Sequence, residues 1–317
     1  MMPARGLCLL GALFLSIFIE GQAAGAAASG ATAVGRQLKA PNEGYNYIRH
    51  GFDWPNIQNT DGSATYPTCS GNAQSPIDID MSQLVDESQR QGTSGVTLND
   101  LNVDAGSGGL SFTQARVKQI EQELRVDFTA SPTDNLPTIT IDGTDMSFTP
   151  LQFHFHHFLS EHTINGVHYP LESHIVMKDS SNLEASDGQL AVIGVMYKYT
   201  NDGAGDAFLN SLETQIRTKI ENGDATYGEM DVPIDNINAK ADLLPSSLEY
   251  VGYDGSLTTP PCDERVKWHV FTTPRMVTID QMKFFMNVTM EAHSDAALVN
   301  NRVLQDLNGR KVYKYGF

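Results

Sequence analysis

Apolar residues fall into short runs through the second half of the chain, and their spacing indicates mostly strands. Segments rich in β-branched and aromatic residues predict strands at 138–141, 147–158, 172–177, 190–199 and 266–273. The segment 190–199 is almost continuously apolar. We therefore expect it to be a central strand, buried on both faces of a sheet.

Two other segments have the spacing of amphipathic helices. In the first, apolar residues recur at helical intervals, namely Phe208, Leu209, Leu212, Ile216 and Ile220. Gly223 follows them as a stop signal. In the second, Thr278 and Gln281 have the form of a capping box before 282–288. The predicted fold class is therefore mainly β with a few surface helices, an α+β protein.

The start of the chain has the features of a secretory signal peptide. Arg5 supplies a positive charge, 7–19 is a mainly apolar run, and small residues follow from 23 to 28. We expect cleavage near Ala24, which assigns residues 1–24 to the signal. The apolar run is too short to span a membrane, and an uncleaved anchor is the alternative.

The rest of the chain is predicted to form one domain. Residues 25–40, rich in Ala, Gly and Ser, are expected to be a flexible leader. The segment 41–317 shows neither an internal repeat nor a dividing linker. Because no second long apolar run occurs, we expect no membrane span and an exported protein, in an extracellular, periplasmic or lumenal space.

The charge and the cysteine content of the chain limit which binding partners and which cellular compartment we expect. The 317-residue chain has a formal net charge of −17, which disfavours nucleic acid and anionic membranes as partners. Cys8 lies in the predicted signal, so Cys69 and Cys262 remain. An oxidising compartment favours a disulfide between them over two separate buried thiols.

A histidine pair lies inside one of the predicted strands. Because side chains alternate along a strand, His154 and His156 point to one face. Phe153, Phe155 and His157 then point to the other face. An H-x-H pair alone is a weak signal, since one exposed and one packed histidine would give the same pattern.

A third histidine follows in the next predicted strand. His174 comes 18 residues after His156, and a connection containing Asn165-Gly166 would return its strand antiparallel beside the first. Three neutral imidazoles with one open position describe a catalytic zinc site. Zinc lowers the pKa of a bound water, so that hydroxide is available as a nucleophile at neutral pH.

Four ordered motifs resemble the α-carbonic anhydrase family from about Gly44 to the C-terminus. They are QSPIDI at 74–79, QFHFH at 152–156, EHT at 161–163 and SLTTPPC at 256–262. The resemblance implies a large, mostly antiparallel twisted sheet and reversible hydration of carbon dioxide to bicarbonate and a proton. Carbonic anhydrases are the standard example of the zinc chemistry described above.

The matched positions imply roles for individual residues. His154, His156 and His174 would bind Zn²⁺. Thr258 would accept the proton of the zinc-bound hydroxide and donate its own proton to Glu161, which orients the nucleophile. Taken alone, Thr258 would more simply be a turn residue and Glu161 a surface carboxylate.

The resemblance also implies supporting groups. Gln152, Glu172 and the backbone carbonyl near Asn300 would each hold one zinc-binding imidazole. Extracellular members resemble this chain in carrying one bridge at the positions of Cys69 and Cys262. That bridge would clamp the loop that carries Thr258.

Carbon dioxide is apolar, so the resemblance implies a dry wall beside the nucleophile. The residues of that wall would be Val176, Val192, Leu257, Thr259, Val266 and Trp268, although each has a plain core role as its alternative. The implied small-molecule partners are carbon dioxide, bicarbonate and water, with sulfonamides and anions as inhibitors.

The chain departs from the family at several positions. Gln122 stands where faster members carry a proton-shuttling histidine, and glutamine does not titrate near neutral pH. Proton export is then expected to be slower, or to use buffer, water chains or Glu123. His157 replaces a common tryptophan and is predicted to pack away from the metal. Asn287 begins a glycosylation sequon that depends on the exporting cell.

Two other functions compete with the enzyme assignment. A carbonic-anhydrase-like binding module with weak catalysis is the alternative, but all three histidines, Thr258 and Glu161 are present. A zinc peptidase is disfavoured because the chain has no H-E-x-x-H motif.

Overall fold

The computed structural model describes a defined part of the chain. The described residues are 44–89, 111–112, 115–120, 123–128, 139–140, 146–183, 185–226, 231–234, 237–290 and 299–317. The chain divides into two compact units, Met1–Lys39 and Ala40–Phe317. The first unit, with the predicted signal 1–24 and most of the predicted leader 25–40, lies outside the described residues, so the following concerns the second unit alone.

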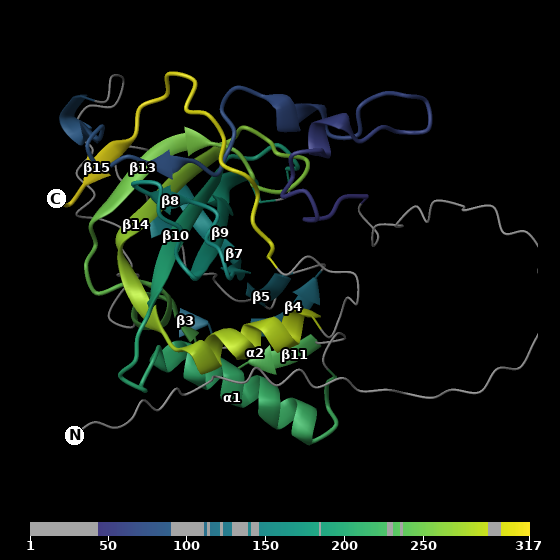
Figure 1. Cartoon of the computed structure of the whole chain (residues 1–317), viewed down its shortest axis with the longest axis vertical. Coiled ribbons are helices and arrows are strands. Elements are labelled where there is room, and N and C mark those ends of the chain that lie inside the picture. The colour runs from purple at the N-terminus through teal and green to yellow at the C-terminus, as the bar shows by residue number, and fades with distance from the viewer. Residues whose placement is uncertain are drawn as a thin grey trace, which may run out of the picture. The chain divides into compact units, whose positions relative to one another are not determined.

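A mixed, mostly antiparallel sheet forms the body of this unit (Figure 1). Its strands, in spatial order, are β11 (Asp231–Ile234), β4 (Ala115–Ile120), β5 (Glu123–Phe128), β7 (Ser147–His157), β9 (Leu171–Asp179), β10 (Leu190–Tyr199), β14 (Val266–Val277), β13 (Tyr250–Gly255), β15 (Tyr313–Tyr315) and β2 (Val85–Asp86), with β6 (Ile139–Thr140) pairing with β7. Only the β10–β14 and β15–β2 pairs among these are parallel. The predicted fold class is confirmed.

Short elements accompany the main sheet. Two small sheets pair β1 (Asp78–Ile79) with β8 (Thr163–Ile164) and β3 (Ser111–Phe112) with β12 (Ile237–Asn238). Single helical turns occupy Trp54–Asn56, Pro67–Ser70, Glu87–Gln89, Ser180–Asn182 and Ala239–Leu243. No helix among the described residues is long and apolar enough to cross a membrane.

Both predicted helices are present and begin at side-chain caps. In α1 (Ala207–Glu221), Asp206 accepts hydrogen bonds from the backbone N–H groups of the first turn. Gly223, at φ 76°, follows its end, as the sequence indicated. In α2 (Ile279–Met290), Gln281 N donates to Thr278 Oγ1 (3.2 Å) and Thr278 N donates to Gln281 Oε1 (3.0 Å), which completes the predicted capping box.

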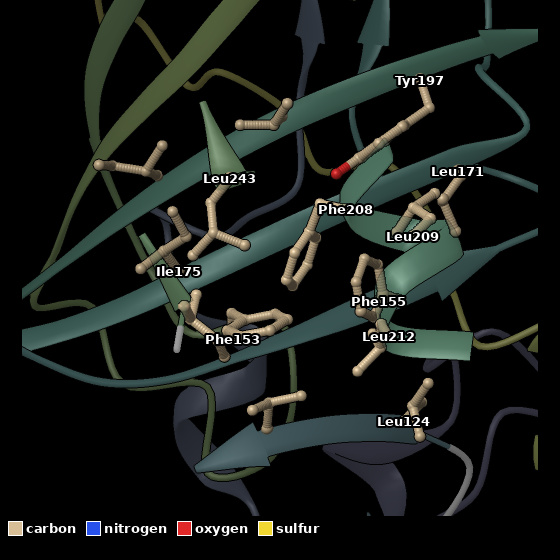
Figure 2. Packing of buried hydrophobic residues seen from close by; sticks show 14 of the residues in the cluster. Leu124, Phe153, Phe155, Leu171, Ile175, Tyr197, Phe208, Leu209, Leu212 and Leu243 are labelled. Atoms are coloured by element: carbon tan, nitrogen blue, oxygen red, sulfur yellow. The ribbon is translucent and has the colours of Figure 1, made fainter. Parts of the chain in front are cut away.

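The main sheet is covered by apolar side chains on both faces. On one face, Phe153 and Phe155 of β7 and Ile175 of β9 belong to the same buried cluster as Phe208 and Leu212 of α1 (Figure 2). On the other face, a second cluster includes Val192, Val266 and Trp268. The first eight residues of β10 are buried, which confirms the prediction of a central strand for 190–199.

A β-bulge in β7 changes which side chains face the helices. The pairing with β9 shifts between Pro150 and Gln152, because Pro150 is opposite Met177 and Gln152 is opposite Val176. Phe148 and Phe153 therefore share the helix-facing cluster despite their odd separation. Beyond the bulge, the alternation places the histidine pair on the opposite face.

Candidate metal centre

Adjacent strands bring the predicted histidines together. In the pairing of β7 with β9, His154 is directly opposite His174, and His156 is opposite Glu172. The connection between these strands contains the tight turn at Asn165-Gly166, where both residues have positive φ, but it also includes β8, which pairs with β1. The return is therefore antiparallel, as predicted, but longer than a simple hairpin.

Each imidazole is held by a different kind of acceptor. His154 Nδ1 lies 2.9 Å from Gln152 Oε1 and His174 Nε2 lies 2.8 Å from Glu172 Oε1. His156 Nδ1 lies 2.6 Å from the backbone oxygen of Asn300. These bonds fix the ring orientations and leave the other nitrogen of each ring for a ligand.

The remaining nitrogens converge on one point. Ligand atoms of His154, His156 and His174 all lie within 4.8 Å of one another, and all three residues are buried. His156 Nε2 makes no hydrogen bond despite its burial. A buried nitrogen without such a partner, beside two more imidazoles, fits a tetrahedral divalent cation with one open position.

The electrostatics keep two of the rings neutral. Burial lowers the pKa of His154 well below its ordinary value, with further lowering from His156, and burial lowers the pKa of His174 to about 3. At His156, burial is again the largest cause and lowers the pKa, but the charges of three carboxylates and the bond to the Asn300 carbonyl together outweigh it, so the pKa is raised; the carboxylates are Glu161, Glu123 and Glu172. Neutral rings have the free lone pairs that metal binding needs.

Glu161 and Thr258 lie against this centre. Glu161 Oε2 is 3.4 Å from His156 Nε2 and 3.9 Å from His174 Nδ1, while Oε1 accepts the backbone N–H of Arg302 at 2.8 Å. Burial raises the pKa of Glu161, against an opposing effect of His156 and a hydrogen bond from Thr258. The threonine hydroxyl therefore connects the carboxylate to the cavity.

Glu172 is shared by two imidazoles. Its Oε1 lies 2.8 Å from both His174 Nε2 and His162 Nδ1, and its Oε2 accepts the backbone N–H of His162 at 2.9 Å. Burial alone would raise its pKa, but His162 and His174 outweigh burial and hold the pKa well below the ordinary value. The proximity of His162, Glu172 and His174 is thus explained by hydrogen bonding, without a second ion.

The polar network continues beneath the centre. His162 Nε2 lies 2.6 Å from the Tyr253 hydroxyl, which lies 2.9 Å from Ser75 Oγ. Ser75 Oγ also accepts the backbone N–H of Ser256, two residues before Thr258. His162 therefore forms structural hydrogen bonds inside the domain.

A cavity of about 180 Å³ opens above the histidines. Its lining comprises Tyr45, Glu123, Arg125, Gln152, His154, His174, Val176, Val192, Leu257, Thr258, Thr259, Pro260 and Trp268. Of the residues predicted for an apolar wall, all except Val266 are in this lining. Val266 is 1% exposed and belongs to the same buried cluster as Val192 and Trp268.

A disulfide joins the two cysteines predicted to pair. Cys69 and Cys262 have Cα atoms 4.9 Å apart and are separated by 193 residues. Cys262 lies four residues after Thr258, in the loop between β13 and β14, so the bridge ties that loop to the N-terminal segment. The bond is consistent with an extracellular or lumenal protein.

Several positions near the cavity were missed or lie outside the described residues. Arg125 lines the cavity together with Glu123. Alternation along β5 places both residues on its less buried face, but it does not show that this face meets the cavity. Gly194 is opposite His174, and a Cβ there would lie 3.1 Å from Glu172 Oε1. The predicted shuttle position, Gln122, is outside the described residues. Asn287 is exposed on α2.

The fold and the site define a class: a single large sheet that carries three converging imidazoles on one face. The sequence model of the eukaryotic-type carbonic anhydrases matches residues 57–316, and the chain belongs to this family. It is 48% identical to a carbonic anhydrase of Dunaliella salina over 282 residues, which cover 87% of this chain and 45% of that relative. It is 36% identical to a Pectobacterium carotovorum carbonic anhydrase over 173 residues, 55% of this chain and 60% of that relative. The chain thus spans about half the length of these relatives.

Solved structures agree with the fold. The crystal structure of a halotolerant carbonic anhydrase from Dunaliella salina superposes with a TM-score of 0.79 at 61% identity, covering 87% of this chain and 100% of that one. The structure of dioscorin superposes with a TM-score of 0.62 at 23% identity, covering 83% and 92%. The second likeness concerns the fold alone.

Proposed function

We propose that the protein is a zinc-dependent carbonic anhydrase that interconverts carbon dioxide and bicarbonate. The observation that carries the proposal is the convergence of the three imidazoles, whose ligand atoms lie within 4.8 Å of one another in a buried site. Nitrogen ligands from three histidines suit zinc, and the family membership supports the reaction.

His154, His156 and His174 would hold the ion, and Gln152, Glu172 and the Asn300 carbonyl would fix their rings. When bound, zinc acts as a Lewis acid that provides hydroxide at neutral pH, a chemistry for which carbonic anhydrases are the standard example.

Thr258 and Glu161 would orient the nucleophile. The Thr258 hydroxyl would donate its proton to Glu161, so its oxygen could only accept from the attacking group. That restriction turns a lone pair of the nucleophile toward the substrate before reaction, which lowers the cost of orientation.

The cavity wall would hold carbon dioxide next to that lone pair. Val176, Val192, Leu257 and Trp268 line it with apolar surface, and Thr259 adds a polar edge. An uncharged linear substrate gains by leaving water for such a wall. Val266, in the same buried cluster as Val192 and Trp268, would complete the wall.

Proton export would proceed without a histidine at the shuttle position. Gln122 does not titrate near neutral pH. Glu123 lines the cavity and accepts a hydrogen bond from the Tyr47 hydroxyl at 3.2 Å, so buffer, a water chain or this carboxylate would carry the proton. The turnover of the wild type should then rise with buffer concentration.

The remaining expectations belong to the same proposal. The predicted signal peptide and the disulfide together indicate an exported protein. Sulfonamides and small anions would inhibit it by binding at the metal, and the net charge of −17 would keep nucleic acid away.

Stopped-flow hydration of carbon dioxide, with zinc content measured on the same samples, tests the proposal. We expect the wild type to bind one zinc, and a strong chelator to abolish its activity. His174→Ala should lose both metal and activity. His168→Ala makes the same change outside the centre, at a ring whose Nδ1 bonds the Ser160 carbonyl, and should retain both. A zinc-loaded wild type without hydration activity would favour a binding module instead.

A further inference from the structure

One charged side chain of the cavity has no place in the chemistry described so far. Arg125 lies on β5 directly opposite His154, and it lines the same cavity as Thr258 and Trp268. Its charge is among the causes that lower the pKa of His154, so its field reaches the metal centre. Carbon dioxide carries no net charge and gives a cation nothing to bind.

The guanidinium is held in place from one side only. Arg125 Nε donates to Asp127 Oδ1 at 2.6 Å, and the two side chains are 32% and 14% exposed. Among the described residues no hydrogen bond from either Nη atom of Arg125 is found, and Asp127 does not line the cavity. The arginine is therefore pinned at Nε, with N–H donors left over.

Such donors match a planar anion. A guanidinium binds a carboxylate through two parallel N–H···O bonds, which a point charge cannot do. Bicarbonate presents a planar carboxylate group of this kind. It is also the only anion among the reactants of the proposed reaction.

We propose that Arg125 is the anion-recognition residue of the cavity, which binds the carboxylate oxygens of bicarbonate beside the metal centre. The inference rests on the proposed function and deepens it by naming the group that distinguishes bicarbonate from carbon dioxide. Competing carboxylates would bind at the same place.

Two carboxylates weaken the attraction between Arg125 and an anion in the cavity. Asp127 neutralises part of the arginine charge from outside the lining, and Glu123 lies in the lining. Because Arg125 is about one-third exposed, solvent also screens it. We therefore expect a moderate contribution to anion affinity, about five- to tenfold in Kd.

The test measures anion binding to the cobalt(II)-substituted full-length protein by its visible absorption. Sodium bicarbonate and sodium acetate are titrated at constant ionic strength, acetate serving as a carboxylate that cannot react. We expect Arg125→Gln to raise both Kd values about five- to tenfold. Arg217→Gln is the matched control, since Arg217 Nε also pairs with a carboxylate, Glu213, at 2.7 Å but on the exposed face of α1. It should change each Kd less than twofold.

Asp127 needs its own control, because Arg125→Gln leaves that carboxylate uncompensated and repulsive to anions. The double variant Arg125→Gln/Asp127→Asn removes both charges. We expect it to bind acetate several-fold more weakly than Asp127→Asn alone. Equal affinities for that pair would overturn the inference and assign the effect to the field of Asp127.

The outcomes separate the two proposals. If Arg125→Gln binds both anions within twofold of the wild type, the role of Arg125 is refuted, while a wild type that hydrates carbon dioxide keeps the proposed function. If the wild type binds cobalt but neither anion alters its spectrum, the role of Arg125 is likewise refuted. If the wild type shows strong anion binding that depends on Arg125 but no hydration, only the proposed function fails.

Discussion

His157 is the clearest place to test how burial acts on a titratable group in this fold. The ring is 1% exposed, and neither of its nitrogens has a hydrogen-bond partner among the described residues. Burial lowers its pKa to about 3, with a further lowering by His156. The proposed change is His157→Phe, which keeps an aromatic ring and removes both nitrogens.

The expected effect depends on pH in a definite direction. The unfolded chain takes up a proton on this histidine below pH 6.5, whereas the folded chain does so only near pH 3. The contribution of the neutral ring to the free energy of unfolding is therefore fully present above pH 6.5, and it is lost as the pH falls toward 3. At pH 5 the unfolded state gains about 2 kcal/mol from this group, at about 1.4 kcal/mol per pKa unit.

His157→Phe should remove the loss of stability that protonation of the unfolded chain causes at low pH. At pH 7 the relief of two unpartnered nitrogens, about 1–3 kcal/mol each when buried, is offset by the larger volume of phenylalanine. The packing cost is the same at both pH values, so it does not affect how the stability difference between variant and wild type changes with pH. Relative to the wild type, the variant should therefore gain about 2 kcal/mol between pH 7 and pH 5.

Urea unfolding followed by tryptophan fluorescence measures this difference. Both proteins are unfolded in chelator at pH 7 and pH 5, so that metal release does not contribute. The other titrating groups cancel in the comparison of variant with wild type. A stability difference that is equal at the two pH values would refute the reasoning, since the buried ring would then titrate alike in both states.

Three further substitutions test the supporting structure. Asp206→Ala removes the cap of α1 and a 2.6 Å ion pair with Arg275, so urea unfolding should show a loss of about 3 kcal/mol, and a loss under 1 kcal/mol would contradict the assigned contacts. Cys262→Ser opens a bridge between residues 193 apart and should cost about 2–5 kcal/mol, with no added effect of reductant on the variant. Glu172→Gln should weaken zinc binding about 10–100-fold in chelator competition, whereas an unchanged affinity would show that His174 is oriented without it.

Much of the site could be predicted from local sequence. Alternation along 147–158 placed His154 and His156 on one face, and the ordered motifs supplied the candidates for the other roles. The capping box at Thr278 and the stop at Gly223 were read from short patterns that involve only neighbouring residues. Such features can be predicted without knowledge of the fold because the interactions that cause them are local.

Other features could not be predicted, since they depend on which strands become neighbours. Arg125 reaches the cavity because β5 pairs with β7 in a register that places it opposite His154. The bulge after Pro150 reverses the side-chain parity of β7, which no periodicity shows. Val266 lies in the same buried cluster as Val192 and Trp268, and this grouping depends on the pairing of β10 with β14.

The chain by itself determined the chemistry available: three imidazoles, acceptors for them and apolar side chains for a wall. The tertiary structure alone decided how these groups meet. The Asn300 carbonyl lies 144 residues from His156, and a one-residue slip between β7 and β9 would turn His154 and His174 to different faces. Register is fixed by burial across the whole sheet, so the arrangement of the metal centre is a property of the fold.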